Sequence, residues 1–229
     1  MLLKIGFLWA LLRKASVNNF YAYSLHRELL EKNIRFYSAF VKGAVLDIGS
    51  KNRRYDAFFK NAKTISALDI RPEKGKGVLA GDARELPFQT DSFDTVISFE
   101  TLEYVLDTQR ALAEISRVLK DEGFFLFSIP FLNPIHGDVD NVRYTEKSLR
   151  LLLDEHFEIK KFVSFGGRYT LIWDFFFERI RNYSGRLKKA LLLAPLFILK
   201  KLAVLLDKRE RSLRFPMGYF CICQKKELP

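Results

Sequence analysis

Four acidic residues stand at the ends of short apolar runs in this chain: Asp47, Asp69, Asp82 and Glu100. Apolar runs of this length, bounded by turn residues, are typical of buried strands, and open α/β sheets bind their ligands where such strands end. Asp69 lies 22 positions after Asp47, close to the offset of an acid that accepts hydrogen bonds from ribose hydroxyls. These residues therefore predict a binding site for a nucleoside.

The loop after Asp47 contains one glycine, Gly49, where a dinucleotide fingerprint contains three. Lys51 and Arg54 occupy the other two positions. NAD requires close approach of the backbone to a pyrophosphate that rests on a helix N-terminus. S-adenosylmethionine has no phosphate and carries a sulfonium cation, so one glycine at its amino-acid end and nearby carboxylates suit it. The loop therefore favours S-adenosylmethionine over NAD.

Strand-like and helix-like segments alternate along the chain, which predicts βαβ units and a mostly parallel α/β sheet. The apolar runs predict strands over Ala44–Ile48, Thr64–Ile70, Gly77–Gly81, Thr95–Phe99, Phe124–Ile129, Phe157–Ser164 and Met217–Gln224. Helical spacing of apolar residues predicts helices over Ala15–Phe40, with Gly43 marking its end, over Asp107–Leu119 and over Thr145–His156.

These segments, in this order, resemble class I S-adenosylmethionine-dependent methyltransferases of the small-molecule type 11 subgroup. The resemblance rests on VLDIG (45–49), Asp69, GDARELPF (81–88), DSFDTVISFETLEYV (91–105) and RALAEISRVLKDEGFFLFSIP (110–130). It covers roughly residues 43–164, over half of the chain. It implies a Rossmann-like, doubly wound sheet that is mostly parallel, with an antiparallel last strand and a helical C-terminal insertion before that strand.

By this resemblance, the cofactor-binding residues are Asp47, Gly49, Asp69, Ile70, Asp82, Ala83, Phe99 and Glu100. The family implies that Gly49 contacts the methionine portion and that Asp69 binds the ribose hydroxyls. Asp82 would accept a hydrogen bond from the adenine amino group, and Phe99 with Glu100 would line the floor below the sulfonium. Lys51 and Arg53 depart from the glycine-rich pattern that the family usually shows here.

The segment from Pro130 to Thr145 is similar to a loop that type 11 methyltransferases of glycan and lipid modification close over their acceptor. Its candidate substrate-binding residues are Asp138, Arg143 and Tyr144. His136 is the candidate catalytic base, since its ordinary pKa suits removal of a proton from a hydroxyl acceptor. An alternative role for His136 and Asp138 is that they only stabilise the turn. For Arg143, two roles stay open: it binds an anionic acceptor group, or it pairs with a loop aspartate.

The net charge of +11 is unevenly distributed. Residues 179–214 carry eleven Lys or Arg against two acidic residues, a net charge of +9, whereas residues 15–178 sum to −2. This pattern disfavours a nucleic-acid-binding core and favours contact with an anionic membrane surface. No apolar stretch reaches the roughly 20 residues of a spanning helix. We therefore expect a cytoplasmic protein, peripheral on the membrane. The C-terminal helices either form a lid over the sheet or lie among the lipid headgroups.

Cys221 and Cys223 are two positions apart. This spacing predicts buried thiols on one face of a strand rather than a disulfide framework or a metal site, and it suits a reducing compartment.

The expected organisation is a helical region (1–42), a methyltransferase core (43–178), a basic amphipathic insertion (179–214) and the last strand of the core (215–229). The expected function is S-adenosylmethionine-dependent methylation of a small-molecule or lipid-linked acceptor, including a glycan hydroxyl. Two alternatives share the fold. An NAD-dependent oxidoreductase or epimerase is disfavoured by the missing glycines and the lack of a Tyr-x-x-x-Lys pair. A non-catalytic binding protein is disfavoured by the acids Asp69 and Asp82.

Overall fold

The computed structural model describes residues 24–135, 140–181, 199–209 and 214–227. The chain forms two compact units. We call Lys32–Ser164 with Gly218–Pro229 the sheet unit, and Met1–Glu31 with Phe165–Met217 the helical unit. The predicted core ended at residue 178, whereas the helix over Arg168–Arg181 belongs to the helical unit.

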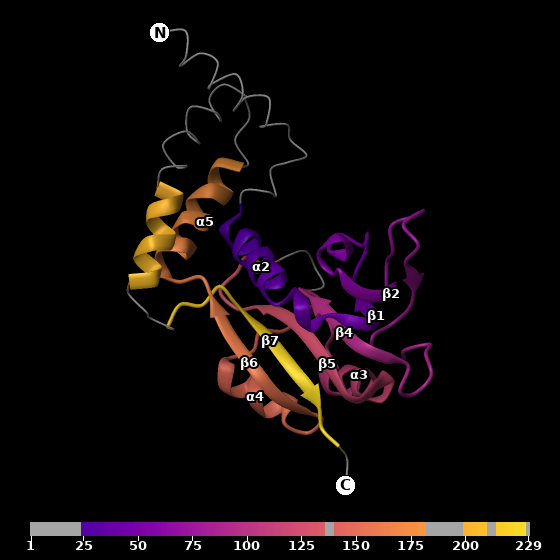
Figure 1. Ribbon diagram of the computed structural model, residues 1–229. Coiled ribbons are helices and arrows are strands. Elements are labelled where there is room, and N and C mark those ends of the chain that lie inside the picture. The colour runs from indigo at the N-terminus through magenta and orange to yellow at the C-terminus, as the bar shows by residue number, and fades with distance from the viewer. Residues whose placement is uncertain (1–23, 136–139, 182–198, 210–213, 228–229) are drawn as a thin grey trace. The chain divides into compact units, whose positions relative to one another are not determined.

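A seven-stranded sheet carries the predicted site, with the strand order β3-β2-β1-β4-β5-β7-β6 (Figure 1). The strands are β1 (Lys42–Ile48), β2 (Asn61–Asp69), β3 (Leu79–Ala80), β4 (Phe93–Phe99), β5 (Leu119–Pro130), β6 (Phe157–Phe165) and β7 (Gly218–Lys225). The pairs from β3 through β5 are parallel, and β7 runs antiparallel to β5. The mostly parallel sheet with an antiparallel last strand is thus confirmed. Strand order reverses between β1 and β4, where such sheets bind ligands.

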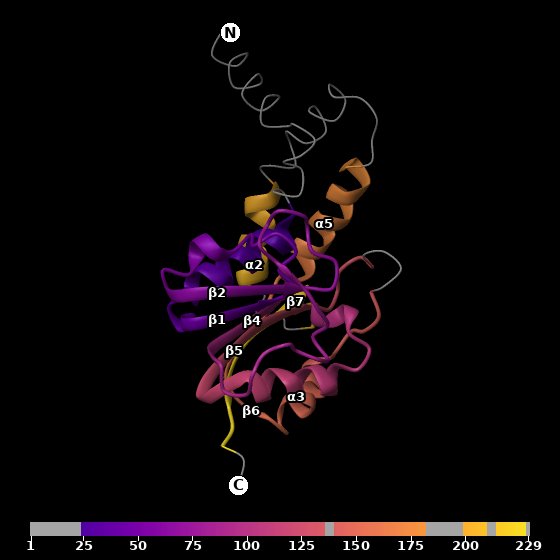
Figure 2. The ribbon, with the colours of Figure 1, turned by 90° about the vertical axis from the view of Figure 1, so that its right-hand side faces the viewer.

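Helices α3 (Thr108–Val118) and α4 (Glu146–Leu153) cover one face of the sheet (Figure 2). Both begin where a capping side chain predicts: Asp107 accepts from the Arg110 N–H, and Thr145 accepts from the Ser148 N–H. Leucine and isoleucine side chains of these helices pack with Phe125 and Phe127, whose rings stack 4.8 Å apart. Both cysteines of β7 are buried in the same cluster, which confirms that they share one face of the strand.

Aromatic side chains pack against the opposite face of the sheet. Tyr37 stacks on Phe220 with 5.6 Å between ring centroids, and Phe40 meets Phe124 edge-on at 5.5 Å. Both come from the segment around the 3-10 turn η2 (Ser38–Phe40), which follows helix α2 (Leu25–Phe36). Aromatic rings therefore pack on both faces of β5 and β7.

The prediction that Gly43 ends the first helix is wrong. Helix α2 ends at Phe36, and Gly43 is the second residue of β1, with a φ of 70° at a shift in register against β2. A Cβ at Gly43 would lie 2.6 Å from Cγ of Asp94, whose carboxylate accepts from the Ala44 N–H at 2.7 Å. The glycine therefore permits a close side-chain approach within a strand, not a helix end.

The connection from β1 to β2 contains only the 3-10 turn η3 (Asp56–Phe58), with no α-helix. Twelve residues, 49–60, separate the two strands, which is close to the shortest length for a helical crossover. The segment also lacks a regular apolar spacing. The loop after Gly49 therefore cannot rely on a following helix for its position.

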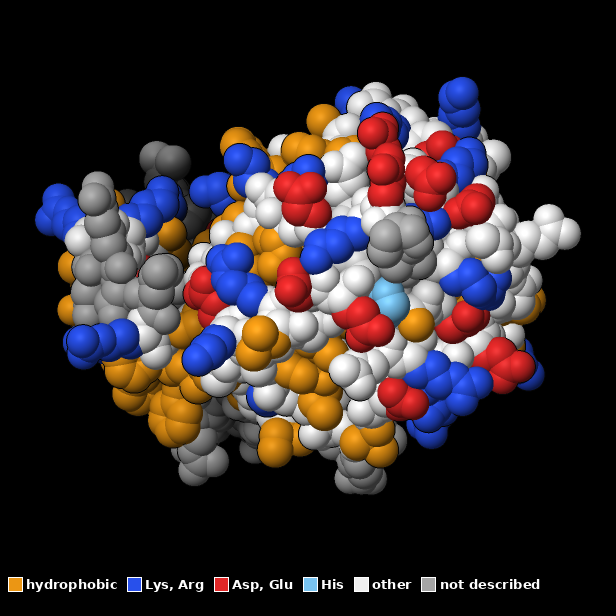
Figure 3. Space-filling model, turned by 90° about the horizontal axis from the view of Figure 1, so that it is seen from below, with side chains coloured by type: hydrophobic (Ala, Val, Ile, Leu, Met, Phe, Trp, Pro, Cys, Tyr) orange, Lys and Arg blue, Asp and Glu red, His pale blue; other side chains and the backbone are white. Residues whose placement is uncertain are grey.

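The surface of the sheet unit in Figure 3 intermixes acidic and basic side chains. Ion pairs such as Arg150–Glu146 at 2.8 Å and Lys226–Asp154 at 2.9 Å are typical of it. Such exposed pairs contribute little stability each. The near balance of charge agrees with the composition of residues 15–178.

The helical unit is built from the start of α2, helix α5 (Arg168–Arg181) and a further helix over residues 199–209. Its buried core consists of Leu25, Trp173, Phe177 and Ala203. Within the described residues, no helix is both long and apolar enough to span a bilayer.

Candidate cofactor and acceptor site

Gly49 follows β1 directly and adopts a φ of 78°. Its N–H donates to the Leu68 carbonyl of β2 at 2.8 Å, and a Cβ on it would lie 2.7 Å from the Cβ of Thr101. Both the conformation and the contact favour glycine over any other residue type at this position. The chain thus brings backbone alone to this corner between β2 and the end of β4.

Asp47 is buried at the end of β1, with 3% of its surface exposed. Burial raises the pKa of its carboxyl to about 7, although a hydrogen bond with the Ser50 side chain acts in the opposite direction. Ser50 belongs to the loop that Gly49 starts. Asp47 therefore contacts the loop that it is predicted to support, and that supporting role stays a prediction.

Arg53 takes over the positioning that a crossover helix would supply. Its Nε donates to Asp56 Oδ2 at 2.8 Å, Nη2 to the Ile65 carbonyl at 3.0 Å, and Nη1 to the Gly77 carbonyl at 3.2 Å. Arg53 itself and Lys51 both have positive φ, 58° and 50°, which is uncommon outside glycine. The contacts of the guanidinium therefore help to hold the backbone in positive-φ conformations at Lys51 and Arg53, which glycine would adopt more readily. From the sequence, Lys51 and Arg53 could be recognised only as basic residues where the family usually has glycines, and their conformation could not be predicted.

Asp69 lies at the carboxyl end of β2, beside the Gly49 loop. Its Oδ2 accepts from the Lys51 N–H at 3.0 Å, and its Oδ1 accepts from the Arg71 N–H at 2.7 Å. Each carboxylate oxygen has two lone pairs, so both can still accept from ribose hydroxyls. Ile70 next to it is 68% exposed, an apolar side chain left uncovered at the predicted ribose position.

Asp82 is paired with Arg84 in a two-pronged contact. Arg84 Nη2 lies 2.6 Å from Asp82 Oδ2, and Nε lies 3.0 Å from Oδ1. This hydrogen bonding lowers the pKa of Asp82, so the group is a carboxylate acceptor. The neighbouring Ala83 is buried, which leaves its backbone as the part available at the predicted adenine position.

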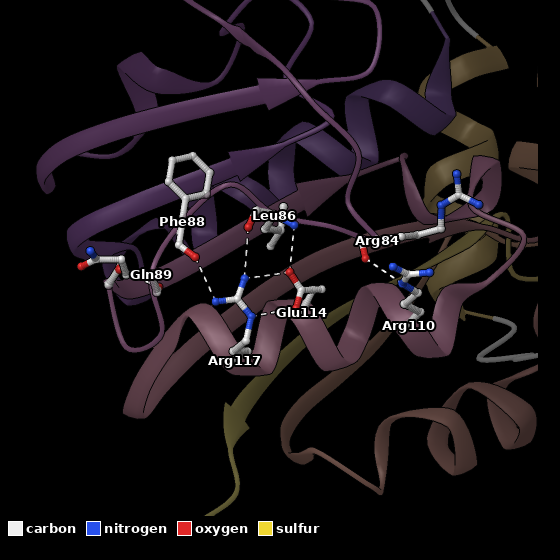
Figure 4. Close-up of polar contacts among 8 residues, drawn as sticks. Arg84, Leu86, Phe88, Gln89, Arg110, Glu114 and Arg117 are labelled. Atoms are coloured by element: carbon white, nitrogen blue, oxygen red, sulfur yellow. Dashed lines mark hydrogen bonds and ion pairs between the residues drawn. The ribbon is translucent and has the colours of Figure 1, made fainter.

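Helix α3 holds the segment that follows Asp82 (Figure 4). Arg117 donates to the carbonyls of Phe88 at 2.9 Å and Leu86 at 3.1 Å, and Glu114 accepts from the Leu86 N–H at 2.8 Å. One turn earlier, Arg110 donates to the Arg84 carbonyl at 3.0 Å. Positions 110, 114 and 117 follow helical spacing, so they form one polar edge of α3. Sequence reasoning missed this edge because its partners are backbone atoms.

Phe99 and Glu100 close the floor at the end of β4. The Phe99 ring stacks on Phe220 at 5.8 Å and meets Tyr55 edge-on at 5.6 Å. Glu100 has a φ of 53°, and its N–H lies 3.1 Å from the Ser128 hydroxyl oxygen, while that hydroxyl donates to Glu100 Oε1 at 2.9 Å. The ends of β4 and β5 are therefore joined below the predicted sulfonium position.

Glu103 is a buried carboxyl that sequence reasoning missed. Its Oε2 has no hydrogen-bond partner within the described part of the chain. Burial, followed by the nearby Glu100 carboxylate, raises the pKa of Glu103 well above its usual range. Its backbone carbonyl accepts from the N–H groups of Asn141 at 2.9 Å and Val142 at 3.1 Å. The predicted acceptor loop is thus docked on the turn that follows β4.

Arg143 pairs with Asp140, with Nη2 at 2.6 Å from Oδ2 and Nη1 on Oδ1. Of the two alternatives for Arg143, the structure therefore shows the pairing with a loop aspartate. The Tyr144 hydroxyl donates to Thr108 Oγ1 at 2.9 Å, and its ring packs on the core of the sheet unit. His136 and Asp138 lie outside the described residues.

Comparison with known proteins agrees with this geometry. A family model described as a methyltransferase domain matches residues 46–127. The putative methyltransferase YrhH of Bacillus subtilis is 33% identical over 129 residues, which cover 49% of this chain and 67% of that protein. The chain belongs to the class I S-adenosylmethionine-dependent methyltransferases, in the type 11 group. S-adenosylmethionine is the cofactor of this methyltransferase domain.

Other relatives share only part of their length with the chain. An uncharacterized protein of Methanocaldococcus jannaschii, MJ1252, is 31% identical over 129 residues, which cover 54% of this chain and about half, 49%, of that protein. The rice chloroplastic 2-methyl-6-phytyl-1,4-hydroquinone methyltransferase 2 is 40% identical over 63 residues, 28% of this chain and 17% of that protein.

The fold also matches solved structures. Phosphoethanolamine N-methyltransferase 2 of Haemonchus contortus, solved with S-adenosyl-L-methionine, superimposes with a TM-score of 0.57 at 17% identity, covering 94% of this chain and 58% of that one. At this identity the likeness shows a shared fold.

Proposed function

We propose that this protein is an S-adenosylmethionine-dependent methyltransferase that acts on a small-molecule acceptor. The observation that carries the proposal is the junction of two strand ends, where Asp69 accepts the Lys51 N–H at 3.0 Å. This contact joins Asp69, to which we assign the ribose hydroxyls, to the loop that begins at Gly49. The junction lies beside the reversal of strand order between β1 and β4, where this fold binds ligands.

The residues present fit the cofactor. A side chain at Gly49 would overlap Thr101, so this position is suited to glycine, and a backbone without a side chain suits a close approach of the methionine portion. Asp69 offers two oxygens to vicinal hydroxyls, and the carboxylate of Asp82 can accept from an amino group. When bound, S-adenosylmethionine supplies the methyl group that is transferred.

The protein's part in such a transfer is alignment and exclusion of water, since in-line displacement depends mainly on these. Phe99, fixed between two aromatic rings, supplies a rigid apolar floor. The contacts of Glu103 with residues 141–142 hold the acceptor loop against the end of β4. For a hydroxyl acceptor, we assign removal of the proton to His136, as expected from the sequence.

We further propose a lipid-linked acceptor, such as a glycan hydroxyl on a lipid carrier. The rice relative is named for a substrate with a phytyl chain, and the loop resembles that of glycan- and lipid-modifying enzymes. The basic, apolar region at 179–214 supports an acceptor that stays at a membrane. We propose the cytoplasmic face of that membrane as the place of reaction.

Calorimetric titration of the purified protein tests the cofactor. S-adenosylmethionine and S-adenosylhomocysteine should bind, NAD should not, and Asp69→Ala should weaken adenosyl binding by about a hundredfold, because charge-assisted hydrogen bonds are lost. Asp121→Ala is the matched control, since Asp121 is an exposed acid at the other end of β5. Binding of NAD alone, or equal loss in both variants, would overturn the proposal.

A further inference from the structure

The helix over residues 199–209 exposes three leucines, and two of its five charged residues face neighbouring helices. Leu199, Leu202 and Leu205 are each close to half exposed. Lys200, Ala203 and Asp207 lie on the opposite side, at helical spacing, and are buried or partly buried. A surface helix of a soluble protein normally shows the reverse arrangement.

Two partly buried acids cap helices of this unit, and one of them lies on the helix over residues 199–209. Asp174 of α5 accepts from the N–H groups of Leu25 at 2.9 Å and His26 at 3.0 Å, at the start of α2. Asp207 accepts from the N–H groups of Tyr169 and Thr170, each at 2.9 Å, at the start of α5. Each cap satisfies helix N–H groups that would otherwise lack partners.

A third polar contact joins the outer helix to α2. Lys200 forms an ion pair with Glu28, and its Nζ lies 5.6 Å from the centroid of the Trp173 ring. The Lys200 side chain is only 12% exposed. Turning the helix to bury its leucines would break this pair and the Asp207 cap together, so the outward orientation of the leucines is built into the unit.

Helix α5 adds further apolar side chains to the outside of the same unit. Trp173 and Phe177 stack 4.9 Å apart in its core. Ile172, Phe175 and Phe176 are at other positions of the helix and are 47%, 71% and 54% exposed. We use the name apolar face for the exposed apolar residues of this unit, which are these three together with Leu199, Leu202 and Leu205.

Basic side chains accompany the apolar face. Lys201, Lys208 and Arg209 are exposed on the same helix as the three leucines. The only acidic residues of 179–214 are Asp207 and Glu210, and Asp207 is engaged as a cap. The accessible charge beside the leucines is therefore positive, which complements an anionic surface.

We propose that the apolar face inserts into the headgroup layer of an anionic lipid membrane while the adjacent lysines and arginine contact lipid phosphates. Phenylalanine and leucine side chains at a helix surface partition to this depth, and lysine stems extend alongside them to reach the headgroups. The inference rests on the helical unit alone, so it stands or falls separately from methyl transfer.

Vesicle flotation of the full chain tests the inference. The protein should float with phosphatidylcholine vesicles that contain phosphatidylglycerol, and much less with phosphatidylcholine alone. Phe175→Glu combined with Leu202→Glu should lower the partition coefficient at least about tenfold. Leu151→Glu is the matched control, because Leu151 is an exposed leucine, 68% against 46% for Leu202, on α4 of the sheet unit. It should float like the wild type.

Two results would overturn the inference. One is a wild type that stays in the dense fraction with both vesicles; the other is equal loss in the control and the double variant. Sedimentation velocity without lipid separates a different occupant: if the double substitution converts a dimer to a monomer and vesicles do not bind, the apolar face joins two copies of the chain. Retained binding of S-adenosylhomocysteine by the double variant would show that the variant is folded.

Discussion

The carboxylate of Asp69 accepts a hydrogen bond from the backbone N–H of Lys51 at 3.0 Å. Asp69, which is expected to bind the ribose hydroxyls, therefore also holds the loop that starts at Gly49 in place. The segments expected to recognise the two ends of the cofactor already contact each other, which would reduce the ordering that binding must impose.

Gly49→Ala should abolish measurable binding of S-adenosylhomocysteine and destabilise the protein by several kcal/mol. The added Cβ meets Thr101 and the φ of 78° disfavours alanine. Titration calorimetry and urea unfolding measure the two effects. Gly75→Ala is the control, because Gly75 has a φ of 76° but nothing within 4 Å of an added Cβ. If both variants behave alike, the contact with Thr101 is irrelevant.

Arg53→Met should weaken S-adenosylhomocysteine binding by about tenfold or more, because three contacts that hold the loop disappear. Arg54→Met removes an exposed neighbour of the same charge and should change little. Comparing their calorimetric affinities checks the assignment. Equal weakening by the two substitutions would show that only net charge at the loop matters.

Relative to the wild type, the free energy of unfolding of Asp47→Asn should increase as the pH rises. The folded-state pKa of Asp47 is about 7 against 3.8, so between these values the folded protein keeps a proton that the unfolded chain has lost. The stability of the wild type relative to Asp47→Asn should therefore be highest below pH 3.8, fall as the pH rises, and level off above pH 7. The total difference is roughly 4 kcal/mol. Urea unfolding at several pH values measures it, and a pH-independent difference would refute it.

Glu103→Leu should raise the melting temperature, because a buried carboxyl whose Oε2 has no partner among the described residues is replaced by an apolar side chain of similar size. Binding of S-adenosylhomocysteine should persist, since the loop contacts use the Glu103 carbonyl. Scanning calorimetry gives the first result and titration the second. A destabilisation larger than about 1 kcal/mol would mean that the carboxyl supports the fold rather than the site.

The strands and two helices of the sheet unit could be predicted because their signals are local. Short apolar runs mark the strands, and Asp107 and Thr145 cap the helices that their positions predict. The roles of Arg53 and Arg117 could not, because both donate to backbone carbonyls that distant segments bring near. A carbonyl has no residue-specific signature. Gly43 is an example of a misleading local signal. Its position after a helical pattern predicted a helix end, whereas it lies in β1, where the Asp94 side chain approaches closely.

The contacts inside the helical unit could not be predicted from the sequence either. Composition alone identified a basic, apolar segment, and left open how its charged residues are used. Asp207 and Lys200 turn out to hold neighbouring helices, and this decides which side of the helix the leucines occupy. Lys200 and Asp207 thus fix how the helix over residues 199–209 is rotated about its axis, which the spacing of its apolar residues did not predict.

The place of β7 in the sheet has a consequence for how the protein is made. Leu126 of β5 pairs with Ile222 of β7, 96 residues later. The ribosome must therefore synthesise the whole helical unit before the strand between β5 and β6 exists. During that interval the β5 edge, with Phe125 and Phe127, has no partner strand. Folding of the sheet unit is thus a late, non-local event, and the nascent chain meets other binding surfaces, chaperones included, before its largest sheet is complete.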